Sequence, residues 1–79
     1  MTTDEKDILL TAEQASDIIY TVMKDLNIEY KKDFCRLFCM PYSTVNHILE
    51  GNKPAGTTAT LLFLIGKEPK RVMDLLSLA

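Results

Sequence analysis

The chain has 79 residues, of which 47% are hydrophobic and 25% are charged, and its formal net charge is −2. This length suits one small domain with a modest core, and the composition is that of an ordinary globular protein. No apolar run approaches the roughly 18 residues of a membrane span, and the acidic start lacks the basic flank of a secretory signal. We therefore expect a cytoplasmic protein without a membrane segment.

The first part of the chain predicts an arm followed by an amphipathic helix. Residues 1–10 are expected to form the N-terminal arm. Thr11 and Gln14 have the spacing of a capping box, in which a hydroxyl and an amide satisfy free N–H groups at a helix start. Apolar residues then recur three and four positions apart, at Ala12, Ala15, Ile19, Val22 and Leu26. This period predicts a helix over residues 12–26 that ends at Asn27.

A second, shorter helix is predicted over residues 31–39. Its expected apolar face consists of Phe34, Leu37 and Phe38. Pro41 follows, and because proline is well tolerated only in the first turn of a helix, it predicts a tight turn at residues 39–40. We therefore expect two short helices joined by this turn.

The third helix is predicted over residues 41–50, with the inward side chains Val45, Ile48 and Leu49. Gly51 is expected to end it, because glycine readily takes the positive φ angle that is common just after a helix. Residues 51–56 have the glycine and proline content of a loop.

Two more helices are predicted, over residues 57–65 and 69–78, with Gly66 closing the first and Pro69 beginning the second. No alternation of polar and apolar residues indicates a strand. We therefore expect an all-α fold, a five-helix bundle, in a single domain over residues 1–79. The predicted core includes Phe34, Phe38, Val45, Ile48, Leu61 and Leu62.

The chain lacks the residue sets on which catalysis and metal binding depend. It contains one histidine and two cysteines, Cys35 and Cys39, whereas a structural zinc site needs about four ligands. Both thiols are expected to be free and buried as small apolar groups. The sequence contains no nucleophile–histidine–acid set and no glycine-rich phosphate loop. We therefore expect no metal, no cofactor and no enzymatic activity.

Charge is distributed unevenly along the chain. Residues 1–29 contain seven acidic and two basic side chains, whereas residues 30–71 contain seven basic and three acidic ones. DNA binding requires a local basic face rather than a basic total. The middle of the chain is therefore the candidate nucleic-acid-binding part, although a solvated surface with no partner would give the same pattern.

Residues 31–50 have the layout of a helix-turn-helix, in which a short helix leads through a turn into a helix whose N-terminal half is crowded with polar residues. Residues 12–78 also resemble the Cro/repressor-type (XRE-type) helix-turn-helix domain. The resemblance rests on Phe34–Phe38, Ser43–Val45, Ile48–Pro54, Gly56–Leu62 and Lys67–Pro69. It implies a lambda-repressor-like five-helix bundle that binds duplex DNA, usually as a dimer on a palindromic operator, and regulates transcription in the manner of phage repressors or antitoxins.

The proposed recognition helix carries hydrogen-bonding side chains at Tyr42, Ser43, Thr44, Asn46 and His47. In a helix-turn-helix such positions face base edges in the major groove, where hydroxyl, amide and imidazole groups can bond to bases or phosphates. Each of these residues also has an alternative role that does not involve DNA. Hydroxyls cap helix ends, an aromatic ring can anchor a turn, and the amide and the imidazole can simply be solvated.

The candidate contacts to the DNA backbone are Lys31, Lys32, Arg36, Asn52 and Lys53. Phosphate contacts position a domain without reading sequence. Asn52 and Lys53 carry the most weight, because the loop after the recognition helix commonly meets the sugar–phosphate backbone in the family that the chain resembles. A solvated charged face is the alternative for all five.

The chain ends hold more leucine than so short a chain can easily bury. Residues 8–10, together with Leu75, Leu76 and Leu78, predict an exposed apolar patch and therefore a homodimer; the alternative is that both ends pack back onto the bundle. A protein-interaction module on the same fold, such as an antitoxin that binds a toxin, remains the alternative function, since the first part of the chain is acidic.

Overall fold

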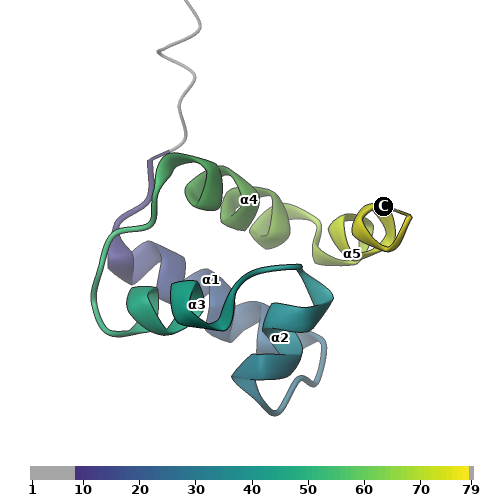
Figure 1. Ribbon diagram of the computed structural model, residues 1–79. Helices are drawn as coiled ribbons and strands as arrows, with labels where there is room; N and C mark the ends of the chain where they lie inside the picture. The colour runs from purple at the N-terminus through teal and green to yellow at the C-terminus, as the bar shows by residue number, and fades with distance from the viewer. Residues whose placement is uncertain (1–8, 79) are drawn as a thin grey trace, which may run out of the picture.

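A computed structural model describes residues 9–78, which form five α-helices and no β-strand (Figure 1). The helices are α1 (Ala12–Asp25), α2 (Lys31–Leu37), α3 (Tyr42–Leu49), α4 (Gly56–Lys67) and α5 (Pro69–Ser77). The predicted all-α, five-helix architecture is confirmed, and most of the predicted arm lies outside the described residues. No helix in this part of the chain has both the length and the apolar character that a membrane span requires.

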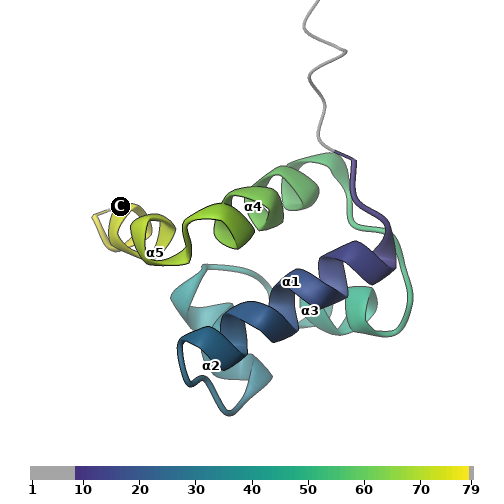
Figure 2. The same ribbon diagram turned by 180° about the vertical axis from the view of Figure 1, so that it is seen from behind.

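Helix α1 packs against both α4 and α3, and both views show α4 above α1 and α3 (Figure 1, Figure 2). Its predicted capping box is present. The Gln14 N–H donates to Thr11 Oγ1, and the Thr11 N–H donates to Gln14 Oε1, each over 3.0 Å. Asn27, just beyond the helix, takes a φ of 57°, a left-handed conformation that asparagine tolerates better than most residues. The predicted helix stop is therefore confirmed.

The core lies between these helices and is entirely apolar among the described residues. Its largest fully buried side chains are Phe34, Phe38, Ile19, Ile48, Leu62, Ile65 and Val45. The rings of Phe34 and Phe38 pack with their centroids 4.9 Å apart. Five of the six predicted core residues are thus buried, whereas Leu61 is only partly buried because it lies at the edge of the inner face of α4.

Helix α2 ends at Leu37, two residues earlier than predicted. The predictions that Cys39 is buried and that Leu37 belongs to the buried apolar face are wrong. The Met40 N–H closes the helix by donating to the Cys35 carbonyl over 2.9 Å, and Cys39 takes a left-handed φ of 55°. Cys35 is buried but Cys39 is exposed. Leu37 is 42% exposed, because Phe34, Cys35 and Phe38 occupy the inner face of the helix.

Helix α4 continues to Lys67, so the prediction that Gly66 closes it is wrong. A Cβ atom at Gly66 would lie 3.3 Å from Ile18 Cγ1 of α1. Glycine at this position therefore allows α4 to approach α1 closely, and this packing outweighs the tendency of glycine to end a helix. Gly51, in contrast, has a φ of 105° and follows the end of α3 as predicted.

The leucines predicted to form an apolar patch at the chain ends are only partly exposed. Leu9, Leu75 and Leu78 are 73%, 58% and 81% exposed, whereas Leu10 is buried in the core. Leu76 packs against the core and is partly buried. Ile8 lies outside the described residues. The exposed leucines of this set therefore lie at two separate places, one before α1 and one on and just after α5.

We expect Phe34→Ala to lower the free energy of unfolding by about 3–5 kcal/mol, because the ring is fully buried and its removal leaves a cavity beside Phe38. Urea denaturation would measure this loss. Leu64→Ala is the control, since Leu64 is 49% exposed on α4 and its truncation should change stability by about 0.5 kcal/mol or less. Similar small losses for both variants would contradict this description of the core.

Candidate nucleic-acid interface

Helix α3 is anchored by one side and open to solvent on the other. Val45 and Ile48 are 0% and 1% exposed, and the Ser16 hydroxyl of α1 donates to the Ile48 carbonyl over 3.5 Å. Ser43 and His47 are exposed, and because they are four residues apart their side chains share one face of the helix. The burial of the apolar side therefore presents this polar face to solvent.

The first turn of α3 is not capped by a side chain. Pro41 is the N-cap residue, and its carbonyl accepts from the N–H groups of Thr44 and Val45 over 3.1 and 3.2 Å. The capping role considered for Ser43 and Thr44 is thus not found at this helix start. Ser43 is exposed and Thr44 is partly buried, so Ser43 is the better placed of the two to meet a ligand.

A small polar cluster connects the first residue of α2 to the exposed face of α3. Lys31 Nζ donates to Asn46 Oδ1 over 2.9 Å and lies 5.9 Å from the centroid of the Tyr42 ring, within the range of a cation–π contact. These contacts link α2 to α3 and keep one positive charge beside the exposed face of α3. The side-chain oxygen of Asn46 thus accepts from Lys31, and the N–H groups of the same amide remain available as donors.

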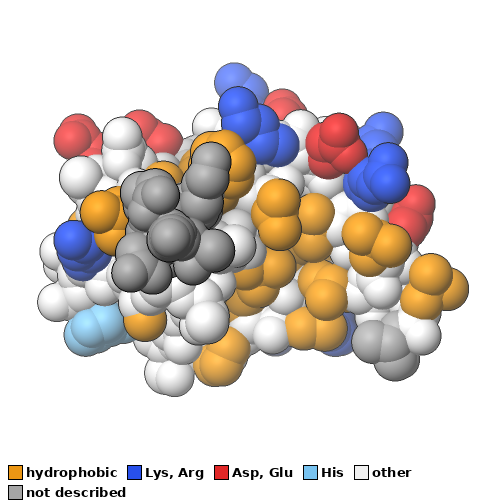
Figure 3. All heavy atoms as spheres, turned by 90° about the horizontal axis from the view of Figure 1, so that it is seen from above, with side chains coloured by type: hydrophobic (Ala, Val, Ile, Leu, Met, Phe, Trp, Pro, Cys, Tyr) orange, Lys and Arg blue, Asp and Glu red, His pale blue; other side chains and the backbone are white. Residues whose placement is uncertain are grey.

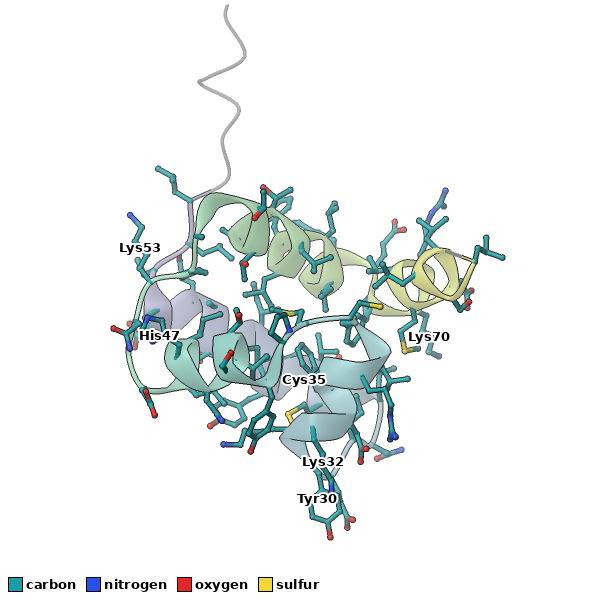
Figure 4. The ribbon with its side chains drawn as sticks, viewed as in Figure 1. Tyr30, Lys32, Cys35, His47, Lys53 and Lys70 are labelled. Atoms are coloured by element: carbon teal, nitrogen blue, oxygen red, sulfur yellow. The ribbon has the colours of Figure 1, made fainter. Side chains whose placement is uncertain are left out.

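A hollow of about 480 Å³ lies between α3 and the beginning of α4. Its polar lining comes from Ser43, Thr44, His47, Lys53 and Thr58. Figure 4 shows His47 and Lys53 at the same end of the molecule. Thr58 was not predicted from the sequence. The pattern of Lys53 followed within five residues by hydroxyl residues at a helix start could have indicated it.

The same hollow borders the N-terminus of α4. Ala55 is the N-cap residue and no side chain caps this helix, so the N–H groups of its first turn have no intrahelical acceptor. A helix N-terminus carries a partial positive charge. Together with Lys53, this end of α4 makes the hollow favourable for a negatively charged group.

Three of the predicted backbone-contact residues do not line this hollow. Arg36 pairs with Asp33 over 2.5 Å and borders a separate hollow of about 350 Å³ between α2 and α5. The Asn52 side chain donates to the His47 carbonyl over 2.9 Å, so it satisfies the C-terminal end of α3. Lys32 is exposed beside Tyr30 at the tip of α2, away from His47 and Lys53 (Figure 4).

Two lysine side chains flank α3. Glu50 is the single acidic residue in the segment 39–55, and it follows the C-terminal end of α3 rather than lying on its first turn. Lys31 and Lys53 flank the helix through the polar cluster and the hollow. The face therefore combines two cations with hydrogen-bonding groups.

The two cysteines have different environments. Burial raises the pKa of the Cys35 thiol, opposed in smaller measure by a backbone hydrogen bond and by the charge of Lys31. Cys39 is exposed in the turn before α3. Across residues 9–78, no three histidine, cysteine or acidic side chains come together to hold a metal ion.

We expect Cys39 to react rapidly with a disulfide reagent such as DTNB in the folded protein, because its thiol is exposed. Cys35 should react only when the chain unfolds, because the thiolate is the nucleophile and burial disfavours the Cys35 thiolate by raising its pKa. Cys39→Ser should remove the rapid phase, and Cys35→Ser should leave it. In denaturant the two thiols should react at similar rates. A native protein in which both thiols react equally fast would contradict the burial of Cys35.

The chain shows no match to models of known protein families, to curated proteins or to solved structures. The functional interpretation therefore rests on the geometry and charge of the face just described.

Proposed function

We propose that the chain is a sequence-specific duplex DNA-binding protein and a transcriptional regulator. In this proposal α2, the turn at residues 38–41 and α3 form a helix-turn-helix, with α3 as the recognition helix. The observation that carries the proposal is the two-sided character of α3. Its apolar side, Val45 and Ile48, is fully anchored, while Ser43 and His47 share an exposed polar face.

The size of α3 suits a major groove. An α-helix with its side chains is about 10–12 Å across, and the B-DNA major groove is about 12 Å wide. Helix-turn-helix proteins direct the N-terminal residues of the recognition helix at base edges. Ser43 is the second residue of α3 and His47 is one turn further on, so both are suitably placed to contact bases.

The polar cluster limits what Asn46 can do. A side-chain amide reads adenine by using its oxygen and its N–H group together, but Asn46 Oδ1 already accepts from Lys31 Nζ. This bond occupies one of the two lone pairs of the oxygen and orients the amide, so we assign Asn46 a contact through its N–H group, with Tyr42 and Lys31 beside it. Ser43 and His47 become the principal base-reading residues, with Thr44 in a lesser role.

The hollow between α3 and α4 is the proposed seat of a DNA phosphate. Lys53, the Thr58 hydroxyl and the uncapped N-terminus of α4 surround it, and each is a common phosphate contact. Lys31 would approach the backbone from the other end of α3. We propose that binding occludes a promoter and represses transcription, with two copies acting on a palindromic operator.

DNA binding itself is the first test. A mobility-shift assay at low salt, with random duplex and then with duplex selected by the protein from a random pool, should show binding at micromolar or lower protein concentration. If neither DNA is bound at micromolar protein, the proposal fails and a protein-interaction module on the same fold becomes the better interpretation.

Ser43→Ala and His47→Ala should each weaken binding to the selected duplex by about 5- to 150-fold, since a good base contact contributes about 1–3 kcal/mol. Binding to random duplex should change by less than about twofold, because phosphate contacts supply non-specific affinity. Thr21→Ala, an exposed hydroxyl residue of α1, is the matched control and should leave both affinities unchanged. Equal losses on the two duplexes would remove Ser43 and His47 from base reading.

Lys53→Ala should weaken binding to selected and random duplex by similar factors. A phosphate contact contributes through counterion release, so its loss should reduce the slope of log K against log salt by about 0.9. Lys24→Ala, which removes the same charge from an exposed position of α1, should leave the slope unchanged. A slope that is the same for Lys53→Ala and the unmodified chain would place Lys53 off the DNA backbone.

A further inference from the structure

A second hollow, of about 310 Å³, lies between α1 and the junction of α4 and α5. Figure 2 shows this junction above the C-terminal half of α1. The apolar part of its lining consists of Ile18, Val22, Gly66 and Pro69. Gly66 keeps the hollow open, because a Cβ atom at this position would lie 3.3 Å from Ile18 Cγ1 and fill the space beside it. No residue lines both this hollow and the one that contains Lys53, so the two are separate.

Two carboxylates stand at the rim of this hollow. Asp17 and Asp25 are exposed, and both belong to its lining. They are eight residues apart on α1, which corresponds to about 12 Å along the helix at 1.5 Å per residue. Within residues 9–78, neither of them makes a salt bridge. The hollow therefore combines an apolar lining with two negative groups that lie about two helical turns apart.

The surroundings of Asp25 favour a cation at one end of the hollow. Asp25 is the last residue of α1, and the C-terminal end of a helix carries a partial negative charge. Lys67 is the one basic residue of the lining. Its Nζ lies 5.4 Å from the centroid of the Phe63 ring, within the range of a cation–π contact. This contact draws the Lys67 charge toward a ring that does not line the hollow.

Other parts of the surface do not select a ligand by charge. A larger hollow of about 770 Å³ beside the loop between α1 and α2 is bordered by two acidic and two basic side chains, Lys24, Glu29, Asp33 and Arg36. Figure 3 shows hydrophobic side chains gathered on the upper surface that α4 and α5 form, with charged side chains of both signs along one edge. The hollow with Asp17 and Asp25 differs from both, because its acidic groups outnumber its single basic one.

We propose that the hollow between α1 and the α4–α5 junction binds an aliphatic diamine. The hydrocarbon chain of the ligand lies on the apolar lining, and its two ammonium groups meet Asp17 and Asp25. Ammonium–carboxylate contacts are charge-assisted hydrogen bonds, and the burial of methylene groups adds a hydrophobic contribution. A monoamine would satisfy only one of the two carboxylates. The proposal goes beyond the proposed function and does not rest on it.

The exposure of both carboxylates sets the expected strength of binding. Exposed ion pairs contribute little and are weakened by salt, and a chain in an open hollow leaves water only in part. We therefore expect a Kd of about 1–10 mM for octamethylenediamine at low ionic strength. Affinity should depend on chain length, because ethylenediamine is too short to reach carboxylates about 12 Å apart.

An NMR titration of the backbone amides tests the proposal, with the total ionic strength held at about 50 mM. Octamethylenediamine, added to about 15 mM so that the expected Kd is covered, should cause saturable shifts concentrated in residues 17–25 and 66–69. Octylamine has the same chain but one ammonium group, and it should bind at least about threefold more weakly. Ethylenediamine should cause no saturable shift.

Substitutions at the two ends locate the ammonium groups. Asp17→Asn and Asp25→Asn should each weaken the binding of octamethylenediamine about threefold, and the double variant about tenfold, because effects at well-separated positions add. Lys67→Gln should instead strengthen binding about twofold, since it removes a like charge. Glu50→Gln is the matched control, because Glu50 is an exposed carboxylate after α3 that does not line the hollow. Circular dichroism should show unchanged helix content in all variants.

Three results would each overturn the proposal. The first is a titration without saturable shifts in residues 17–25 and 66–69. The second is equal affinity for octamethylenediamine and ethylenediamine, which would reduce the contact to charge attraction alone. The third is a loss of affinity that is the same for Glu50→Gln as for Asp17→Asn and Asp25→Asn. None of these results bears on DNA binding, which is measured separately with duplex DNA.

Discussion

The burial of Val45 and Ile48 is the contact on which the candidate interface depends. These two residues fill the side of α3 that faces the bundle, and the rotation of a short helix is set by whichever side chains it buries. With that rotation given, the side chains of Ser43 and His47 face the solvent. Core packing and surface chemistry are therefore coupled: a change that rotates α3 would reposition its polar side chains as a group.

The contacts around α3 also show that polar residues on one face have different tasks. Asn52 satisfies the end of α3 through its bond to the His47 carbonyl, and Lys31 links α2 to α3 through Asn46. Both residues stabilise the arrangement that presents Ser43 and His47. The total stability of a small domain is only of the order of 5–15 kcal/mol, so single contacts of this kind matter. They support function by holding the exposed groups in place.

The close approach of α4 and α1 has consequences at both ends of α4. Gly66 allows α4 to lie against Ile18, and with that contact made, the N-terminus of α4 borders α3 and forms the hollow that contains Lys53. At the other end, α4 leads directly into α5, which reaches the edge of the bundle and buries none of its side chains completely. The proposed DNA face thus depends on the placement of α4.

Local sequence determined the five helices, the Thr11–Gln14 capping box, the stops at Asn27 and Gly51 and most of the core, because hydrophobic period and capping chemistry act over only a few residues. It also placed the hydrogen-bonding residues of α3 on one helix. Which of them share a surface with Lys53 and Thr58, and which is bonded to Lys31, was decided only in the folded chain. The same is true of Gly66 and Leu37, whose environments depend on Ile18 and on the paired phenylalanines. These outcomes arise from contacts between helices that are distant in sequence, and no local pattern records such contacts.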